Sequence, residues 1–517
     1  MLFTNCSCLG NVLSIFGTLF VLFYFLMKYK HTYWERRGFP TLPSHWFFGH
    51  AKNSILLRTS PGQNLGELYQ LAKDDDPVVG IYILHQPFLL LRSPDLIKQI
   101  LIKDFNMFCN RYFSAKSIKD KVGSSNLFTM DNPEWKYVRT KLTPVFTSGK
   151  IKKLFHLMVE SADSMKEHLQ ERFADGAKTK TIHLRDLITK YATNIISTVA
   201  FGISTNSFLA RDSEFYEETI RFFCMFFFPR IGELLRGEML AESTNYFRRV
   251  FWSSMNAREA SKTKRGDLID NLVDLKNEKQ ESNTFKFEGD CLLSQSAIFF
   301  IAGRESSVTT MMFGLYELAK QPDIQTRVRE EILEKLETQG LTYESVHEMK
   351  YLYQVISETL RMYPAAPLLD RVAVEDYKIP GTKLVIEKGT PIYVPLCGLH
   401  YDPRLFPDPT RFDPDRFSEE RKSEIVQGSY MPFGEGPRIC IGKINLRFFI
   451  GIVRTTLIDM FFVSGLRLGM LQSAMGLITV LKDYEVMLDP SCDYKIDVRN
   501  IFTTASEGFR LNFKKIN

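Results

Sequence analysis

The sequence predicts a mainly α-helical domain with small β-sheets, preceded by one N-terminal transmembrane helix. Long stretches repeat apolar residues every three or four positions, as amphipathic helices do, whereas strand-like stretches are few and short. The first 27 residues carry no charged side chain. A segment of this kind is typical of a membrane span rather than of a surface helix.

Residues 1–27 are expected to anchor the chain in a membrane. Residues 12–27 are almost wholly apolar, and about 20 such residues in a helix cross the hydrocarbon core of a bilayer. Four basic residues follow between positions 28 and 37, opposed only by Glu35. The positive-inside rule places them, and the body of the chain, in the cytosol. A cleaved signal peptide is the alternative, but it lacks a basic start and a small-residue cleavage site.

Residues 28–45 form a basic, proline-containing linker, and residues 46–517 are expected to form one domain. No long Gly/Ser linker, low-complexity tract or internal repeat divides this part of the chain. The apolar spacing predicts helices over 150–173, 291–320 and 325–339. The stretch 382–395 predicts a hairpin with its turn at Glu387, Lys388 and Gly389.

The composition excludes several classes of function. The formal net charge is +6 for 517 residues, and no Lys/Arg block resembles a nucleic-acid-binding arm. The eight cysteines are scattered without a C-x-x-C pair, which argues against a disulfide framework or a structural zinc site. The 42 phenylalanines suit an apolar interior or an apolar ligand. No nucleic-acid partner is expected.

The stretch 431–442, MPFGEGPRICIG, surrounds one cysteine with small residues and a cation. Its pattern F-x-x-G-x-R-x-C-x-G is carried by Phe433, Gly436, Arg438, Cys440 and Gly442. All five positions match the signature of the cytochrome P-450 haem-thiolate enzymes. The flanking stretches 141–155, 313–323 and 411–417 resemble the insect microsomal branch of this superfamily, in its sixth family of detoxification enzymes.

This resemblance implies haem b as the cofactor, lying between the long central helix and the Cys-loop helix of a cytochrome P-450 fold. Cys440 would give its thiolate to the haem iron, a ligation that favours O–O cleavage. Gly436 and Gly442 would keep side chains away from the porphyrin, and Arg438 would pair with a propionate. The resemblance also implies that Trp135 and Arg139 in WKYVR reach the haem propionates. Arg111 and Arg371 would be further propionate partners. For any single arginine, a solvated surface position is the alternative.

The stretch AGRESS, 302–307, resembles the oxygen-handling segment of the family. Ala302 and Gly303 would leave room for O₂, and Glu305 and Ser306 would pass protons as a catalytic acid–alcohol pair. Ser306 replaces the usual threonine, and Arg304 stands where close relatives carry an apolar residue. A guanidinium within a buried helix needs a partner, so Arg304 can divert Glu305. A helix kink without catalysis is the alternative.

A buried ion triad is expected from Glu358, Arg361 and Arg416. Glu358 and Arg361 stand at i and i+3, on one face of a helix, and Arg416 in PDRF resembles the third member of the family's triad. Its role is structural, because loss of one partner strands a buried charge at about 3–5 kcal/mol. A surface salt bridge is the alternative for the E-x-x-R pair alone.

Residues 443–465 interrupt the family pattern. Without these residues the sequence would read CIG-LRLGMLQ, which is the expected continuation into the Cys-loop helix. Gly442-Lys443 can be encoded with a splice donor, and the residues up to Gly465 with a splice acceptor. A retained intron or gene-model error is therefore the hypothesis for this segment.

The resemblance implies a monooxygenase on the cytosolic face of the endoplasmic reticulum membrane, acting on lipophilic small molecules. Its partners would be an NADPH-dependent cytochrome P-450 reductase, cytochrome b5 and membrane lipid. Two alternatives remain: a reductase-independent isomerase or dehydratase, and a haem-binding protein impaired by Arg304 and the insert. The aromatic stretch 221–232 fits a lid or a core helix equally well. Basic residues that would face a reductase, or are merely solvated, are Lys136, Lys141, Lys150, Lys152 and Lys153.

Overall fold

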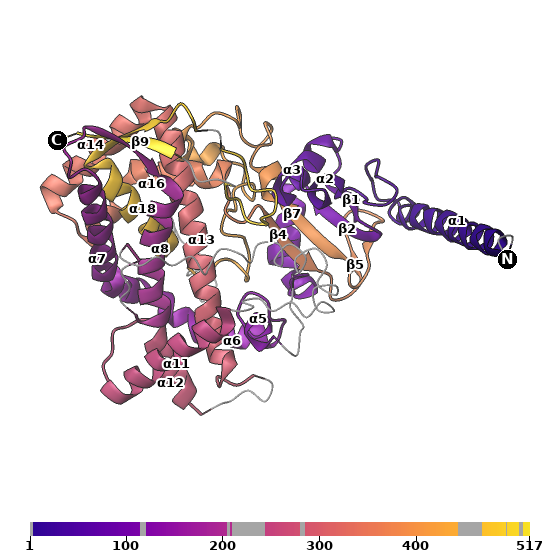
Figure 1. Cartoon of the computed structure of the whole chain (residues 1–517), viewed down its shortest axis with the longest axis horizontal. Helices are drawn as coiled ribbons and strands as arrows, with labels where there is room; N and C mark the ends of the chain where they lie inside the picture. The colour runs from indigo at the N-terminus through magenta and orange to yellow at the C-terminus, as the bar shows by residue number, and fades with distance from the viewer. Residues whose placement is uncertain are drawn as a thin grey trace.

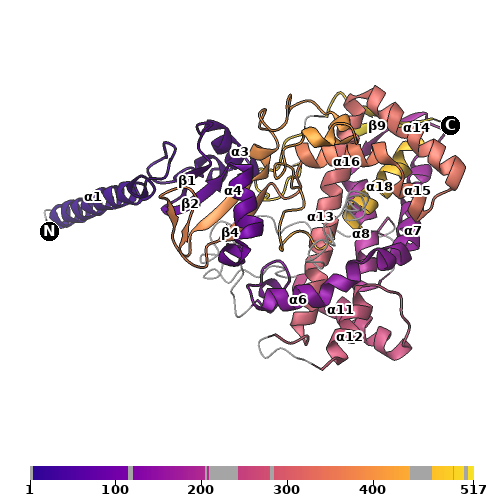
Figure 2. The same cartoon turned by 180° about the vertical axis from the view of Figure 1, so that it is seen from behind.

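The computed structural model describes residues 4–113, 120–203, 207–208, 243–279, 285–442, 468–492, 494–505 and 510–516. Figure 1 shows a broad body and one helix, α1 (Thr4–Lys30), that projects away from it. The body has a sheet-containing part beside α1 and a larger helical part that holds the C-terminus, as the view from behind in Figure 2 also shows.

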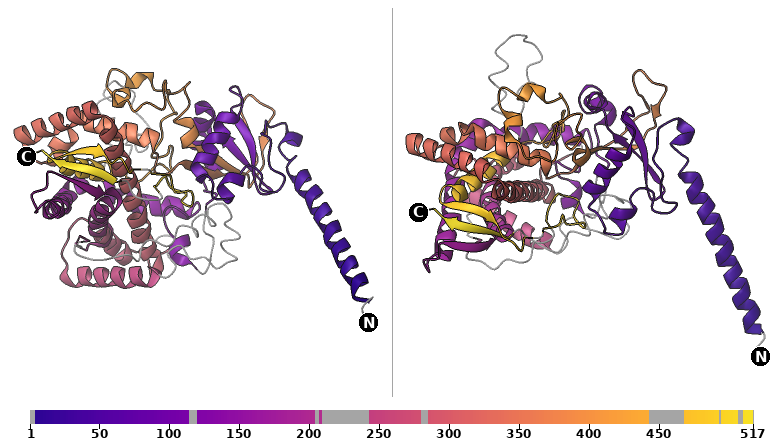
Figure 3. Two further views of the ribbon diagram at one scale, coloured as in Figure 1. Left: turned by 45° about the horizontal axis from the view of Figure 1, so that its top comes forward. Right: turned by 90° about the horizontal axis from the view of Figure 1, so that it is seen from above.

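Helix α1 is attached to the sheet-containing part at its C-terminal end. Within the described residues it is the one helix long and apolar enough to cross a membrane, with a mean hydropathy of 1.8. The aromatic ring of Trp46 lies 5.9 Å from that of Phe20 and 5.3 Å from that of Tyr24. Trp34, which follows the helix, is buried and donates a hydrogen bond from its indole nitrogen to the carbonyl of Ile81, at 3.1 Å. Figure 3 shows α1 standing clear of the body in two further views.

The sheet beside α1 has four strands in the order β1-β2-β7-β4. Strands β1 and β2 pair antiparallel with Val79 opposite Leu90, β2 pairs parallel with β7, and β7 pairs antiparallel with β4. These buried, β-branched and leucine-rich strands form one hydrophobic core with the neighbouring helices α2, α3 and α17. The elements of this part are β1 (Val78–Ile83), β2 (Gln86–Leu91), β4 (Leu368–Val372), β5 (Tyr377–Lys378), β6 (Val385–Ile386), β7 (Pro391–Pro395), α2 (Lys52–Ile55), α3 (Pro61–Leu71), α4 (Pro94–Lys98) and α17 (Leu396–Leu399).

The helical part is built around α13 (Asp290–Lys320), which packs against α8, α18, α5 and α16. Its residues from 307 to 319 are nearly all buried, so α13 is the axis of the larger hydrophobic core. The other helices are α5 (Lys121–Ser124), α6 (Glu134–Leu142), α7 (Ser148–Arg172), α8 (Leu184–Phe201), α11 (Ser243–Ser261), α12 (Leu268–Asn277), α14 (Pro322–Gln339), α15 (Tyr343–His347), α16 (Lys350–Met362) and α18 (Leu468–Leu481). A second sheet, in the order β3-β9-β8, covers one end with β3 (Thr179–His183), β8 (Tyr484–Leu488) and β9 (Arg510–Lys515).

The structure confirms the mainly helical class and the three predicted long helices, which are α7, α13 and α14. The hairpin predicted over 382–395 is wrong. A turn does occur there, with Gly389 at φ 84°, but β6 pairs with β5 and β7 pairs with β2 and β4. All five residues of β7 are buried. A strand buried along its whole length belongs between two partners rather than at the edge of a hairpin.

Candidate active site

The loop 431–442 folds back on itself so that Cys440 lies opposite Phe433, at the base of the turn formed by residues 434–439. The amide of Gly434 donates to the carbonyl of Met431 at 2.9 Å, and the amide of Cys440 donates to the carbonyl of Phe433 at 2.9 Å. Gly434 has φ 76°, a conformation that favours glycine. The Cys440 side chain is exposed, and a Cβ added at Gly442 would lie 3.7 Å from its sulfur. The loop therefore offers one accessible thiol beside a position without a side chain.

Gly436 is required for a reason that the sequence analysis did not give. It has φ 75°, and a Cβ built on it would lie 1.9 Å from the carbonyl oxygen of Leu101. The glycine at this position therefore lets the Cys loop pack directly on the backbone near Leu101. Room for a porphyrin, the predicted reason, is not what the contacts at Gly436 show.

Arg438 is buried beneath the loop and is held by backbone carbonyls. Its Nε donates to the carbonyl of Cys109 at 2.6 Å, and one terminal nitrogen donates to the carbonyl of Met130 at 2.9 Å. Its guanidinium also lies over the ring of Trp135, 4.4 Å from the centroid. Neither carbonyl was predicted, because a backbone acceptor leaves no signature in the side-chain sequence.

Arg111 and Arg371 join Arg438 in one cationic cluster. Arg371 is buried and donates to the carbonyl of Asp370 at 2.7 Å, and Arg111 pairs with the Asp370 carboxylate at 2.8 Å. Burial and the other guanidiniums lower the pKa of Arg438 to about 8 and that of Arg371 to about 9, despite the nearby Asp370. Because arginine scarcely gives up its proton in proteins, the cluster is short of negative charge.

Three nitrogens of this cluster are buried without a hydrogen-bond partner among the residues that the structure describes. They are Nε of Arg111, Nε of Arg371 and Nη1 of Arg438. Buried donors are rarely left unpaired, since each costs about 1–3 kcal/mol. Arg139, on α6, adds a fourth guanidinium: burial lowers its pKa to about 10, and the Cys440 sulfur opposes that shift. The residues present therefore fit a bound group that carries carboxylates and also reaches Cys440. Haem is such a group: its two propionates would pair with the arginines, and its iron would reach the Cys440 sulfur.

The stretch 302–307 lies in the middle of α13, which runs unbroken through it. Ala302 is exposed, as expected for a residue that borders a site. Gly303 faces helix α8: a Cβ built on it would lie 2.5 Å from the terminal carbon of Ile196 on that helix. The glycine therefore permits close packing of α13 on α8, and the expected local opening of the helix is absent between 302 and 307.

Glu305 and Ser306 are both engaged within α13. Arg304 donates from Nε to Glu305 Oε1 at 3.0 Å, and both side chains are partly buried. The guanidinium of Arg304 also lies over the Phe300 ring, 5.8 Å from its centroid. The hydroxyl of Ser306 donates to the carbonyl of Ala302 at 2.7 Å. The structure thus contains the Arg304–Glu305 pair that the sequence analysis expected, and the acid and the alcohol both have partners inside the helix.

The predicted ion triad is present and buried. Arg361 makes two parallel hydrogen bonds of 2.8 Å with the Glu358 carboxylate, and Arg416 approaches the same carboxylate at 3.4 Å. The amide of Asp413 donates to Glu358 at 2.9 Å, and Arg361 donates to the carbonyl of His400 at 2.8 Å. Glu358 and Arg361 are fully buried, so the surface salt bridge is excluded.

Two predicted features lie outside the described residues: the aromatic stretch 221–232 and the suspected insert 443–465. The described part of the Cys loop ends at Gly442, and α18 begins at Leu468.

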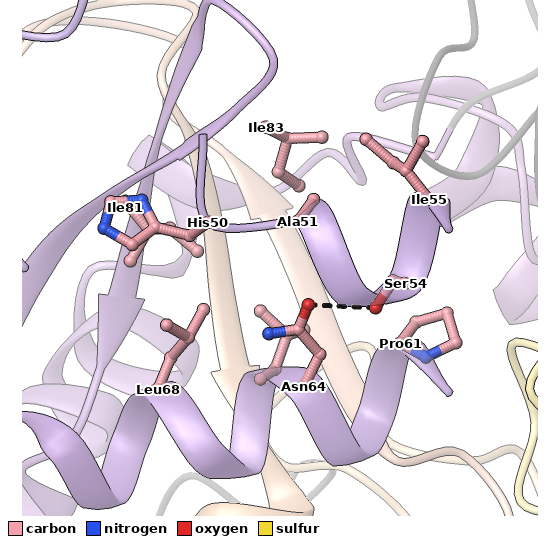
Figure 4. Close-up of a pocket in the computed structure, with 10 residues that line it drawn as sticks. His50, Ala51, Ser54, Ile55, Pro61, Asn64, Leu68, Ile81 and Ile83 are labelled. Atoms are coloured by element: carbon pink, nitrogen blue, oxygen red, sulfur yellow. Dashed lines mark hydrogen bonds between the residues drawn. The ribbon is translucent and has the colours of Figure 1, made fainter. Parts of the chain in front are cut away.

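A pocket in the sheet-containing part holds none of the predicted site residues. It lies between α2, α3 and β1 and is lined mostly by apolar side chains, with Ser54 donating to Asn64 at 3.0 Å (Figure 4). His50 at its rim is buried and bridges two backbone groups: its Nδ1 accepts from the amide of Tyr82 at 2.9 Å, and its Nε2 lies 2.9 Å from the carbonyl of Leu42. These features make it a packing pocket of the sheet.

Comparison with known proteins agrees with the geometry of the Cys loop. The family model described as Cytochrome P-450 matches residues 40–458. Cytochrome P-450 6k1 from Blattella germanica is 42% identical over 488 residues, covering 88% of this chain and 91% of that protein. Probable cytochrome P-450 6g2 from Drosophila melanogaster is 34% identical over 529 residues, covering 97% and 98%. Cytochrome P-450 6j1 from Blattella germanica is 33% identical, covering 99% of both chains. The expected similarity to insect members of the sixth family is confirmed.

Proposed function

Because this chain belongs to the cytochrome P-450 family, we propose that it oxidises lipophilic small molecules with O₂ and with electrons from an NADPH-dependent reductase. The enzyme is an oxidoreductase, a monooxygenase that uses haem b. In the balanced reaction, substrate R–H, O₂, NADPH and a proton give R–OH, water and NADP⁺. The observation that carries the proposal is the accessible Cys440 thiol near a cluster of arginines that has more cations than anions and keeps three buried nitrogens without a partner among the described residues.

Haem, when bound, supplies the activation of O₂, and the residues of this chain hold and orient it. Cys440 would hold the haem iron through its thiolate. Arg111, Arg371 and Arg438 carry the three unpaired nitrogens that suit two propionates, and Arg139 and Trp135 extend this cluster from α6. The backbone carbonyls that bind Arg438 fix its guanidinium before the cofactor arrives, which is how rigid preorganisation lowers the cost of binding.

Glu305 and Ser306 are proposed to hold and move protons on the side of the site bordered by Ala302. Ser306 Oγ donates its proton to the Ala302 carbonyl, so its hydroxyl must turn away from that carbonyl before it can pass this proton on and take another from Glu305. Glu305 must also leave Arg304, which holds it at 3.0 Å. Both groups are therefore present but restrained, and proton delivery requires their release.

The substrates are proposed to be apolar foreign compounds, plant toxins or endogenous apolar molecules. The aromatic side chains near the site support this class, since Phe300 lies beside Arg304 and Phe128 lies under Arg111. Endoplasmic reticulum membrane is the proposed location, with the body in the cytosol, where α1 and the basic residues after it support the orientation. Cytochrome b5 is proposed as a second electron donor.

Lysines 136–153 remain proposed contacts of the reductase. In the structure Lys141 pairs with Glu278 at 2.7 Å, and Lys152 pairs with Glu344. In each pair at least one side chain is exposed. Exposed ion pairs contribute only about 0–1 kcal/mol to stability, so acidic residues of the reductase can replace Glu278 and Glu344 as partners of these lysines.

The test is reconstitution of the full chain with reductase, NADPH and ¹⁸O₂, followed by mass analysis of products from a panel of apolar compounds. One ¹⁸O atom in the product and strict dependence on NADPH are expected. Turnover without NADPH would replace the proposal with an isomerase or dehydratase. A chain that binds haem but yields no labelled product with any compound would support the impaired alternative.

A further inference from the structure

The structure links the buried ion triad to the Cys loop through a residue that no motif names, His400. It directly follows α17 and is fully buried. Its carbonyl accepts from Arg361 Nη1 at 2.8 Å, so it is already joined to the triad through its backbone. Its imidazole makes two further contacts, one on each nitrogen.

The two ring contacts fix the tautomer of His400. Nδ1 lies 3.0 Å from the carbonyl oxygen of Arg361, which can only accept, so Nδ1 carries the proton. Nε2 lies 3.3 Å from the amide nitrogen of Met431, which can only donate, so Nε2 accepts. Protonation would place an N–H against this N–H. Burial and the neighbouring Arg361 accordingly lower the pKa of His400 to about 3.

Met431 is the first residue of the Cys loop, and the bond from His400 reaches the loop at that point. The Met431 carbonyl in turn accepts from the amide of Gly434, and the Phe433 carbonyl accepts from the amide of Cys440. The neighbouring Tyr430 provides a second attachment to α16, since its hydroxyl donates to the carbonyl of Ser357 at 3.0 Å. The loop is thus held to the triad helix by two adjacent side chains.

We propose that His400 is a positioning residue for the thiolate ligand. Through the hydrogen bond between its Nε2 and the Met431 amide, it transmits the fixed position of Arg361 to the start of the Cys loop. This inference rests on the proposed role of Cys440 as the haem ligand. It predicts that loss of the His400–Met431 bond loosens the cysteine and speeds the conversion of haem from thiolate ligation to another ligation state.

Two amide substitutions separate the contacts of the imidazole. His400→Gln can place its side-chain oxygen where Nε2 lies and so retain the bond to Met431. His400→Asn is shorter and can retain only the contact near Nδ1 with Arg361. His400→Leu removes both contacts. Leaving the buried Met431 amide unpaired is expected to change an equilibrium or a rate by about tenfold, which is about 1.4 kcal/mol.

His50 offers a matched control, because it is also buried and also bridges two backbone groups. It does so in the sheet-containing part, at the pocket of Figure 4, and burial lowers its pKa to about 4. His50→Leu therefore imposes the same kind of structural loss without touching the Cys loop.

The experiment follows the reduced, carbon monoxide-bound full-length protein over time, measuring the fraction of haem that keeps the thiolate-type Soret band. We expect that band to decay about tenfold faster in His400→Leu and His400→Asn than in the unsubstituted chain, and within about threefold of it in His400→Gln and His50→Leu. Equal decay in His50→Leu and His400→Leu, or in His400→Asn and His400→Gln, would overturn the proposal. Absence of the band in the unsubstituted chain would instead contradict the haem-thiolate function itself.

If the His400 variants are soluble but retain no haem, the same comparison is made by thiol labelling of the haem-free chain. Cys440 is exposed, so a loosened loop changes its labelling rate without any cofactor. A faster rate in His400→Asn than in His400→Gln supports the proposal, and equal rates contradict it.

Discussion

Arg304 is the residue at which this chain departs most clearly from what the proposed proton relay requires. A proton relay needs an acid that is free to turn, yet Arg304 holds Glu305 and is itself placed over Phe300. The two side chains keep 13% and 24% of their surface exposed, so the pair is neither fully buried nor freely solvated. Such a pair restrains the carboxylate without removing it from the site.

Replacement of Arg304 by leucine is expected to improve proton delivery. Partly exposed ion pairs are worth about 0.2–1 kcal/mol, so the release of Glu305 should raise the product formed per NADPH oxidised by about 1.4- to fivefold. The measurement is the ratio of product to hydrogen peroxide in the reconstituted system. In a Glu305→Gln background the same replacement should have no effect. An equal gain in that background would show that Arg304 acts by another route, such as access of the substrate.

At the scale of single residues, one ion pair was predictable and backbone contacts were not. The E-x-x-R pair is buried as the motif predicted, whereas the two carbonyls that bind Arg438 were not foreseen. The reasons for Gly303 and Gly436 were missed, since they depend on Ile196 and on the Leu101 carbonyl, which are distant in sequence. His400 was missed for the same reason: a histidine that bridges two backbone groups has no partner visible in the side-chain sequence.

At the scale of elements, the triad connects α16 with His400, the residue directly after α17, and with the 3-10 turn η5 (Pro414–Phe417). Glu358→Gln should therefore lower the thermal unfolding temperature strongly, because it strands two buried guanidiniums at about 3–5 kcal/mol. The matched control is Asp415→Asn in η5. Asp415 pairs with Arg327 at 3.0 Å, and both side chains are about half exposed, so the cost there should be at most about 1 kcal/mol. Equal shifts for the two variants would contradict a structural role for the triad.

The segment 443–465 is proposed to be a retained intron or a gene-model error. The segment follows directly on Gly442 in the sequence, and Gly442 itself lies beside the Cys440 sulfur. The family pattern continues into a helix at this point. We expect transcripts that lack the segment, and we expect the protein without it to retain more haem per chain than the protein with it. Transcripts that carry the segment in every case, together with equal haem content, would contradict this proposal.

The elements themselves show why sequence reasoning reached some parts and not others. Long helices such as α13 and α14 can be predicted from sequence because their apolar spacing repeats over many residues. The pairing of strand β7 cannot be predicted in this way, because a run of five buried residues does not indicate which strands lie beside it. Its pairing with β2 joins segments about 300 residues apart in sequence, a relation that local turn signals such as Gly389 do not contain.

At the scale of the whole molecule, α1 is the element that stands apart from the rest of the fold. It projects from the body (Figures 1 and 3), and in its C-terminal half Met27 is buried and aromatic rings contact Trp46 and Phe47. Deletion of residues 2–27 should move the protein from the membrane fraction to the soluble fraction while the thiolate-type spectrum is retained. Fractionation after a high-salt wash checks this outcome. Loss of the spectrum would show that α1 also supports the site, and a mature full-length protein that begins after residue 27 would show a cleaved signal.

The central claim for the whole molecule is that one sulfur, on an accessible loop beside an anion-poor cationic cluster, binds haem iron. The most direct measurement is the carbon monoxide difference spectrum of the reduced full-length chain, compared with that of Cys440→Ser. The account predicts a thiolate-type Soret band for the unsubstituted chain and its complete loss in the variant. The same band in both proteins would contradict the account, since the ligand would then be another residue.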